Sequence, residues 1–139
     1  MRIDVIIEKG KKEFWGRIEG YEFLPVTVGT TVDEVLDNLK MLIADYIEHE
    51  GKDDKKFKRA DVNKIKFDVH YDLRAFFDEY KFLNISSIAA LSGINPSLVR
   101  QYAKGIKHPS TAQAKKVEAT IHQLAEKMNR VSLVGSTVK

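Results

Sequence analysis

The chain has 139 residues, of which 43% are hydrophobic and 31% are charged, and this is the composition of a globular protein. Collagen-like, fully disordered and membrane-spanning classes are excluded. The lack of cysteine excludes disulfides, thiolate metal sites and a cysteine nucleophile. The first residues lack the apolar core of a signal peptide, and no apolar stretch approaches the roughly 18 residues that span a bilayer. We therefore expect a cytoplasmic protein.

The net charge of +3 is unevenly distributed along the chain. Residues 1–70 carry 13 basic and 15 acidic side chains, a net charge of −2, whereas residues 71–139 carry 10 and 5, a net charge of +5. This asymmetry indicates that the C-terminal half contacts a polyanion and that the N-terminal half contacts something else. The alternative is that the positive charge only forms a solvated surface.

Alternating apolar residues predict a small antiparallel sheet near the N-terminus. The segments 2–8 and 14–18 form the expected hairpin, and a third short strand is expected over 23–28. A fourth alternating segment, 65–71, is expected to return to the same sheet.

A helix is predicted between the third and fourth strands. Thr31 and Glu34 have the spacing of a capping box, and the helix should end near His49. Apolar residues recur at helical period at Val32, Val35, Leu36, Leu39, Leu42, Ile43, Tyr46 and Ile47. The highly charged segment 51–61 is then expected to be a loop or linker.

The C-terminal half lacks alternation and predicts four helices, at 72–80, 85–92, 96–104 and 110–129. One face of the last helix carries Val117, Ile121, Leu124 and Met128. The predicted organisation is an α+β domain over 1–71, an all-α domain over 72–130 and a tail over 131–139. The apolar residues of this tail could add a strand or pack on a partner.

Residues 85–105 have the pattern of a helix-turn-helix unit. Ala89 is small where two helices would cross closely, and Gly93 can adopt a positive φ where the chain turns. Asn95 followed by Pro96 supplies an N-cap and a first-turn proline for the second helix. The apolar contacts of that helix would come from Ile94, Val99 and Tyr102.

If the second helix lies in a major groove, its N-terminal end, outer face and flanks present candidate DNA-binding residues, namely Asn95, Ser97, Arg100, Gln101, Lys104 and Lys107. Arg100 can pair with a guanine edge and Gln101 with an adenine edge. Ser97, Lys104 and Lys107 could hold phosphates. The alternative is a helical hairpin with a basic face and no role on DNA.

Residues 72–110 resemble the Cro/C1-repressor type of helix-turn-helix domain. The preceding module, with Glu13-Phe-Trp-Gly-Arg17 and the segment 28–36 entering a helix, resembles the N-terminal domain of the HicB antitoxin family. This resemblance covers nearly the whole chain and implies a partial ribonuclease-H-like domain followed by a DNA-binding domain. In that family the first domain masks HicA, an RNA-cleaving toxin, and the second represses the operon encoding both proteins. Binding to double-stranded operator DNA would require a homodimer or higher even oligomer.

Adjacent residues on a strand point to opposite faces, so one ring of Phe14 and Trp15 faces the helix and the other faces outward. Together with Arg17, these residues are the candidates for toxin binding. The acidic Pro-Asp-Leu-Pro-Gly-Cys stretch common in the family is replaced here by residues 19–26. The alternative is therefore a stand-alone transcriptional regulator without a toxin partner.

A third hypothesis is an RNA-processing enzyme, because ribonuclease-H-like enzymes use clustered carboxylates to hold two metal ions. The candidates are Asp4, Asp45 and Glu48, and no further carboxylate is evidently placed to complete a cluster. The four histidines lack metal-type spacing. We therefore predict no catalysis, no metal site and no cofactor.

Overall fold

The computed structural model describes residues 1–136, and the chain divides into two compact units. The first unit spans Met1–Tyr80, and the second begins at Lys81. Among the described helices, none is long and apolar enough to cross a membrane. Residues 137–139 of the predicted tail lie outside the described residues.

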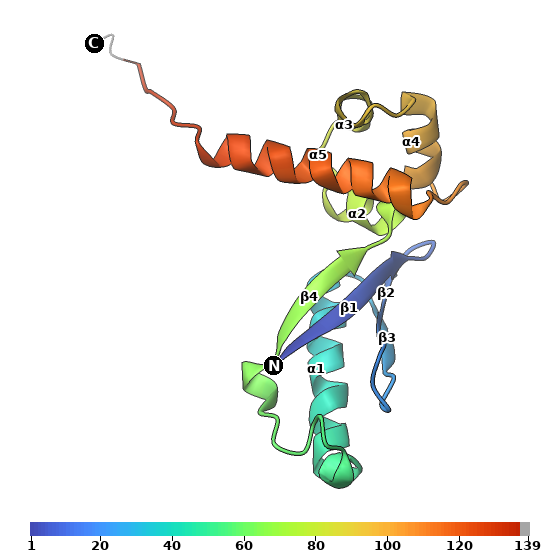
Figure 1. The fold of residues 1–139 in the computed structure, drawn as a ribbon, viewed down its shortest axis with the longest axis vertical. Helices are drawn as coiled ribbons and strands as arrows, with labels where there is room; N and C mark the ends of the chain where they lie inside the picture. Colours follow the sequence, from blue (N-terminus) through green and yellow to red (C-terminus); the bar gives the residue numbers. More distant parts are fainter. Residues whose placement is uncertain (137–139) are drawn as a thin grey trace. The chain divides into compact units, whose positions relative to one another are not determined.

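The first unit is a four-stranded sheet with a long helix along one face (Figure 1). Its elements are β1 (Arg2–Lys9), β2 (Phe14–Ile18), β3 (Val26–Gly29), α1 (Val32–His49), short 3₁₀ turns at Gly51–Asp53 and Val62–Lys64, β4 (Lys66–Tyr71) and α2 (Leu73–Glu79). The predicted strands and helix are confirmed, although β3 begins later than expected. Pro25 has no N–H to donate, and its carbonyl accepts a 3.2 Å hydrogen bond from Ile18 N–H.

The sheet is mixed, so the prediction of an antiparallel sheet is wrong. Its strand order is β3-β2-β1-β4, in which β1–β2 and β2–β3 are antiparallel while β4 runs parallel to β1. In the parallel pair, Ile3 lies opposite Phe67 and Val5 opposite Val69. The reason is that α1 carries the chain back along the sheet after β3, so β4 runs in the direction that β3 and β1 share.

The core of the first unit lies between α1 and one face of the sheet. Ile3, Val5 and Ile7 of β1 are fully buried there, as are Val35, Leu39 and Ile43 of α1. The helix begins with the predicted cap, because Thr31 Oγ1 accepts a 3.0 Å hydrogen bond from Glu34 N–H. The Glu34 carboxylate accepts hydrogen bonds from Thr30, one residue earlier than a capping box requires.

The charged segment 51–61 is a loop of short turns, as expected, and it packs into the first unit. Phe57 is fully buried, and its ring centroid lies 5.1 Å from that of Tyr21 and 5.7 Å from that of Tyr46. The Tyr46 hydroxyl donates a 2.7 Å hydrogen bond to Asp54 Oδ2. This bond lowers the pKa of Asp54 and raises the pKa of Tyr46 to about 12. Phe57 therefore anchors the segment, although its neighbours in the sequence are charged.

Helix α2 belongs to the first unit, so the boundary between units falls after Tyr80 and not after Tyr71 as predicted. Ala75 is fully buried in the core of the sheet domain, and Lys9 Nζ lies 3.2 Å from Asp78 Oδ2. With this boundary the charge asymmetry sharpens. Residues 1–80 carry 14 basic and 18 acidic side chains, net −4, and residues 81–139 carry 9 and 2, net +7.

The second unit consists of α3 (Ile85–Ser92), α4 (Pro96–Ala103) and α5 (Thr111–Asn129), close to the predicted ranges. Helix α3 packs against both α4 and α5. The buried residues are Ile88, Ala89, Ile94, Val99, Tyr102, Val117 and Thr120. Residues 131–136 of the tail are exposed and form no strand.

Candidate functional site

The turn between α3 and α4 has the geometry that its sequence predicts. Gly93 has φ +71°, and its N–H donates a 3.2 Å hydrogen bond to Ala90 C=O. Ile94 N–H donates to Ala89 C=O at 3.0 Å, and the Ile94 side chain is buried. These two hydrogen bonds form a Schellman motif, which ends α3 and reverses the chain. Ala89 is itself fully buried, as expected where two helices cross closely.

Helix α4 begins with a side-chain cap and packs through one face. Asn95 Oδ1 accepts a 2.8 Å hydrogen bond from Ser97 N–H, and Pro96 occupies the first turn. Val99 and Tyr102 are buried on the inner face. The cap therefore fixes where the helix starts, and the buried pair fixes which face remains exposed.

The exposed face of α4 carries Ser97 and Arg100, and Lys104 is exposed at the C-cap of the helix. Arg100 is held in place by two hydroxyl groups, because its guanidinium donates to Ser86 Oγ at 2.8 Å and to Ser97 Oγ at 3.3 Å. Sequence reasoning missed Ser86, which lies on α3, because no spacing within α4 points to it. This arrangement holds a forked hydrogen-bond donor at the surface of the unit.

The other three predicted DNA-binding residues lie in different environments. Lys107 is exposed just beyond α4, and Asn95 is exposed but uses its side-chain oxygen as the cap. Gln101 is only partly exposed, and its Oε1 is buried without a hydrogen-bond partner among the described atoms. Gln101 lies between the exposed and packed faces of the helix, so it is less available for base contact than the sequence suggested.

The second unit has a net charge of +7. Its two acidic residues, Glu118 and Glu126, both lie on α5. Glu118 pairs with Lys115 at 2.9 Å, and Glu126 pairs with Arg130. Residues 85–105 contain no carboxylate side chain, which favours the approach of a polyanion.

The sheet of the first unit has a second face opposite α1, which we call the open face. Phe14 is 4% exposed and belongs to the core, so it cannot contact a partner directly as predicted. Trp15 points the other way and is 44% exposed. Val28 lies opposite Trp15 and Val26 opposite Arg17, and both valines are exposed. Sequence reasoning missed these valines because their alignment with Trp15 depends on strand register.

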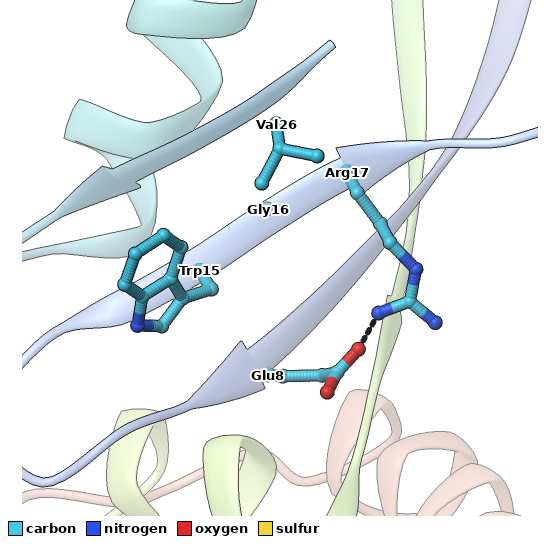
Figure 2. Close-up of a pocket in the computed structure, with 5 residues that line it drawn as sticks. All are labelled: Glu8, Trp15, Gly16, Arg17 and Val26. Atoms are coloured by element: carbon cyan, nitrogen blue, oxygen red, sulfur yellow. Dashed lines mark ion pairs between the residues drawn. The ribbon is translucent and has the colours of Figure 1, made fainter. Parts of the chain in front are cut away.

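A shallow pocket of about 230 Å³ is lined on the open face by Glu8, Trp15, Gly16, Arg17 and Val26 (Figure 2). Arg17 forms an ion pair with Glu8 of the neighbouring strand and a second with Glu19 at 3.0 Å. The pocket thus combines the apolar side chains of Trp15 and Val26 with the ion pair between Arg17 and Glu8. This combination of an aromatic ring, aliphatic side chains and an arginine is typical of protein interfaces.

The carboxylates considered for nuclease chemistry do not come together. Asp4 lies on the open face, where its Oδ1 is 3.0 Å from His70 Nε2 and where Asp68 is its cross-strand neighbour. Asp45 lies on α1, on the other side of the sheet, and its interactions with His49 raise the pKa of that histidine. Within residues 1–136, no group of three or more His, Asp or Glu side chains could hold a metal ion.

No protein-family model, no curated protein and no solved structure matches this chain. Its function is therefore inferred from its own residues and their geometry.

Proposed function

We propose that this protein is a DNA-binding repressor of the HicB antitoxin type that acts as a homodimer or higher even oligomer. The observation that carries the proposal is the Arg100 guanidinium, held at the exposed face of a capped helix that follows a tight Schellman turn. This geometry occurs in a unit with a net charge of +7. A helix-turn-helix of this kind reads bases with its second helix and contacts phosphates with its flanks.

In the proposed complex, α4 lies in the major groove. Arg100 is fixed by Ser86 and Ser97, and it would donate two hydrogen bonds to a guanine edge. Lys104 and Lys107 follow at the C-terminal end of the helix and would neutralise phosphates. Arg100 would therefore provide sequence specificity, whereas Lys104 and Lys107 would provide affinity that is independent of sequence.

Arg100→Ala is expected to lower affinity for the specific operator by about 1–3 kcal/mol and to relax sequence preference. Lys107→Ala is expected to weaken binding evenly on specific and random DNA. The slope of log K against log salt should fall by the contribution of about one phosphate contact. Both effects are measured by fluorescence anisotropy over a range of salt concentrations, on an operator selected from random duplexes. Lys11→Ala, an exposed lysine in the first unit, is the charge-matched control. Equal losses for Arg100→Ala on specific and random DNA would contradict the assigned recognition face.

Dimerisation is part of the proposal, because a single small helix-turn-helix gives little specific affinity. The apolar stripe of α5 supports it. Val117 is buried in its own unit, but Met128 is 66% exposed at the far end of the stripe. Val131, Leu133 and Val134 continue the exposed apolar surface beyond the helix. This surface is the candidate for self-association.

For the first unit, we propose that the open face binds and masks a HicA-like mRNA-cleaving toxin. Trp15, Val26 and Val28 provide the exposed apolar area, and Arg17 and Glu8 provide the polar rim. The strand order, with α1 connecting β3 to a β4 that is parallel to β1, is consistent with a partial ribonuclease-H-like fold. Masking requires only that the toxin's RNA-binding surface be covered, so no residue of this chain need react.

The test is growth of a bacterial host that expresses the reading frame adjacent to this gene, with or without this protein. Growth arrest relieved by the wild-type chain, but not by Trp15→Asp, is expected, since a buried carboxylate would oppose an apolar interface. Met41→Asp, which places the same charge at an exposed apolar position on α1, should still relieve the arrest. Equal rescue by both variants would contradict the assignment of the open face.

The alternative is a stand-alone transcriptional regulator. It is favoured by the segment 19–26, which differs from the stretch common in the antitoxin family. A harmless neighbouring gene product, together with intact operator binding, would select this alternative.

A further inference from the structure

A second basic site lies on the first unit. A pocket of about 520 Å³ is lined by Met1, Lys55, Lys56, Lys58, Arg59 and Ala60. Four of its six lining residues are cationic, although the unit as a whole has a net charge of −4. A hollow lined by charge of one sign concentrates its field and attracts ions of the opposite sign.

The loop that carries these cations is held in one conformation. Phe57 is buried in the aromatic cluster described above, directly between Lys56 and Lys58 in the sequence. Asp54 Oδ1 accepts a 2.9 Å hydrogen bond from Lys56 N–H, and Asp54 C=O accepts a 2.7 Å hydrogen bond from Lys58 N–H. The backbone positions of the cationic residues are therefore set before any ligand arrives, which reduces the backbone entropy lost on binding.

Among the described residues, three of the four cations have no hydrogen-bond or ion-pair partner. Lys56 Nζ donates to Gly20 C=O at 3.0 Å and lies over the Tyr21 ring, so it is already engaged. Lys55, Lys58 and Arg59 are exposed, and their side chains make no ion pair or hydrogen bond with any described residue. Asp54 precedes Lys55 in the sequence and is buried, and its carboxylate accepts a hydrogen bond from the Tyr46 hydroxyl.

We propose that Lys55, Lys58 and Arg59 bind the phosphodiester backbone of a nucleic acid. Exposed cations hold a single anion weakly because water and salt screen each contact. A polymer that presents several phosphates to a fixed set of cations gains from every counterion released. No exposed aromatic ring lines the pocket to stack on a base, so binding would be independent of sequence. The site goes beyond the proposed repressor function, which uses α4.

The test uses the full chain with Arg100→Ala, Lys104→Ala and Lys107→Ala, which silence the α4 contacts. Anisotropy is measured with two labelled probes of about 20 nucleotides or base pairs, a single-stranded RNA and a random DNA duplex. Adding Lys55→Gln, Lys58→Gln and Arg59→Gln is expected to weaken binding about tenfold or more near 0.1 M salt. The slope of log K against log salt should fall by about 2 for the single strand.

The charge-matched control, Lys11→Gln with Lys12→Gln and Lys40→Gln, removes three exposed lysines of the same unit outside the pocket. Near-ultraviolet circular dichroism checks that both triple variants are folded. A loss of affinity that is larger for the pocket triple than for the control triple supports the site. Whether the loss occurs with RNA, with DNA or with both identifies the nucleic acid whose phosphates bind there. No binding of either probe before the pocket triple is added, or equal losses in the pocket and control triples, would overturn the proposal. Because α4 is silenced throughout, this outcome is independent of operator binding.

Discussion

Phe57→Ala is expected to reduce the free energy of unfolding of the first unit by about 3–5 kcal/mol. The side chain is fully buried, and its ring contacts those of Tyr21 and Tyr46. Its removal leaves a cavity in an aromatic cluster and releases the only fully buried hydrophobic anchor within segment 51–61. The expected cost is a large fraction of the stability of a unit of this size.

Urea denaturation monitored by tryptophan fluorescence measures this change, because Trp15 lies in the same unit. Lys58→Ala is the control, since Lys58 is exposed and its removal should change stability by no more than about 0.5 kcal/mol. A loss below about 1 kcal/mol for Phe57→Ala would mean that the charged segment contributes little to the fold. Operator binding is a useful second readout. The proposed DNA-binding residues belong to the second compact unit, so Phe57→Ala should leave operator binding unchanged.

Gly16→Ala is expected to destabilise the first unit by about 2–3 kcal/mol. A Cβ atom at this position would lie 2.3 Å from Val35 Cγ1 and 3.2 Å from Ile7 Cδ1. Val35 belongs to α1 and is itself fully buried, so relief requires either a strained rotamer of Val35 or movement of the helix away from the sheet. The close approach of α1 to β2 thus depends on the missing side chain.

Thermal and urea unfolding of Gly16→Ala measure this effect. Gly135→Ala is the matched control, because a Cβ at that position meets no heavy atom within 4 Å. Its stability should stay within about 0.5 kcal/mol of wild type. Unchanged stability for Gly16→Ala would show that α1 can shift without loss of packing.

The two proposed activities reside in units with separate cores, so they can be tested separately. Core variants of the first unit should impair partner masking while leaving α4 intact. Variants of Arg100 and Lys107 should impair operator binding while leaving the sheet intact. The pocket lined by Met1 and residues 55–60 adds a third surface, which Arg100 and Lys107 variants leave intact but core variants such as Phe57→Ala would disturb.

Local patterns in the sequence determined most of the secondary structure. Period-2 alternation predicted β1 and β4, and a run of aromatic and β-branched residues predicted β2. Helical periodicity and cap residues predicted α1 and the three helices of the second unit. The turn at Gly93 and the cap at Asn95 were also predicted, because they depend on residues that are adjacent in the chain. These features are set by backbone sterics and short-range hydrogen bonds, which the sequence displays directly.

Tertiary structure alone decided the features that depend on which elements meet. The parallel pairing of β4, the inclusion of α2 in the first unit and the burial of Phe57 all follow from packing between distant segments. The alignment of Trp15 with Val28 on the open face depends on strand register in the same way. The hydroxyl of Ser86 holds Arg100 across two helices, and Gln101 is partly buried at the edge of α4. A local pattern specifies the conformation of its own segment, but contacts between segments are decided by how all of them share one core.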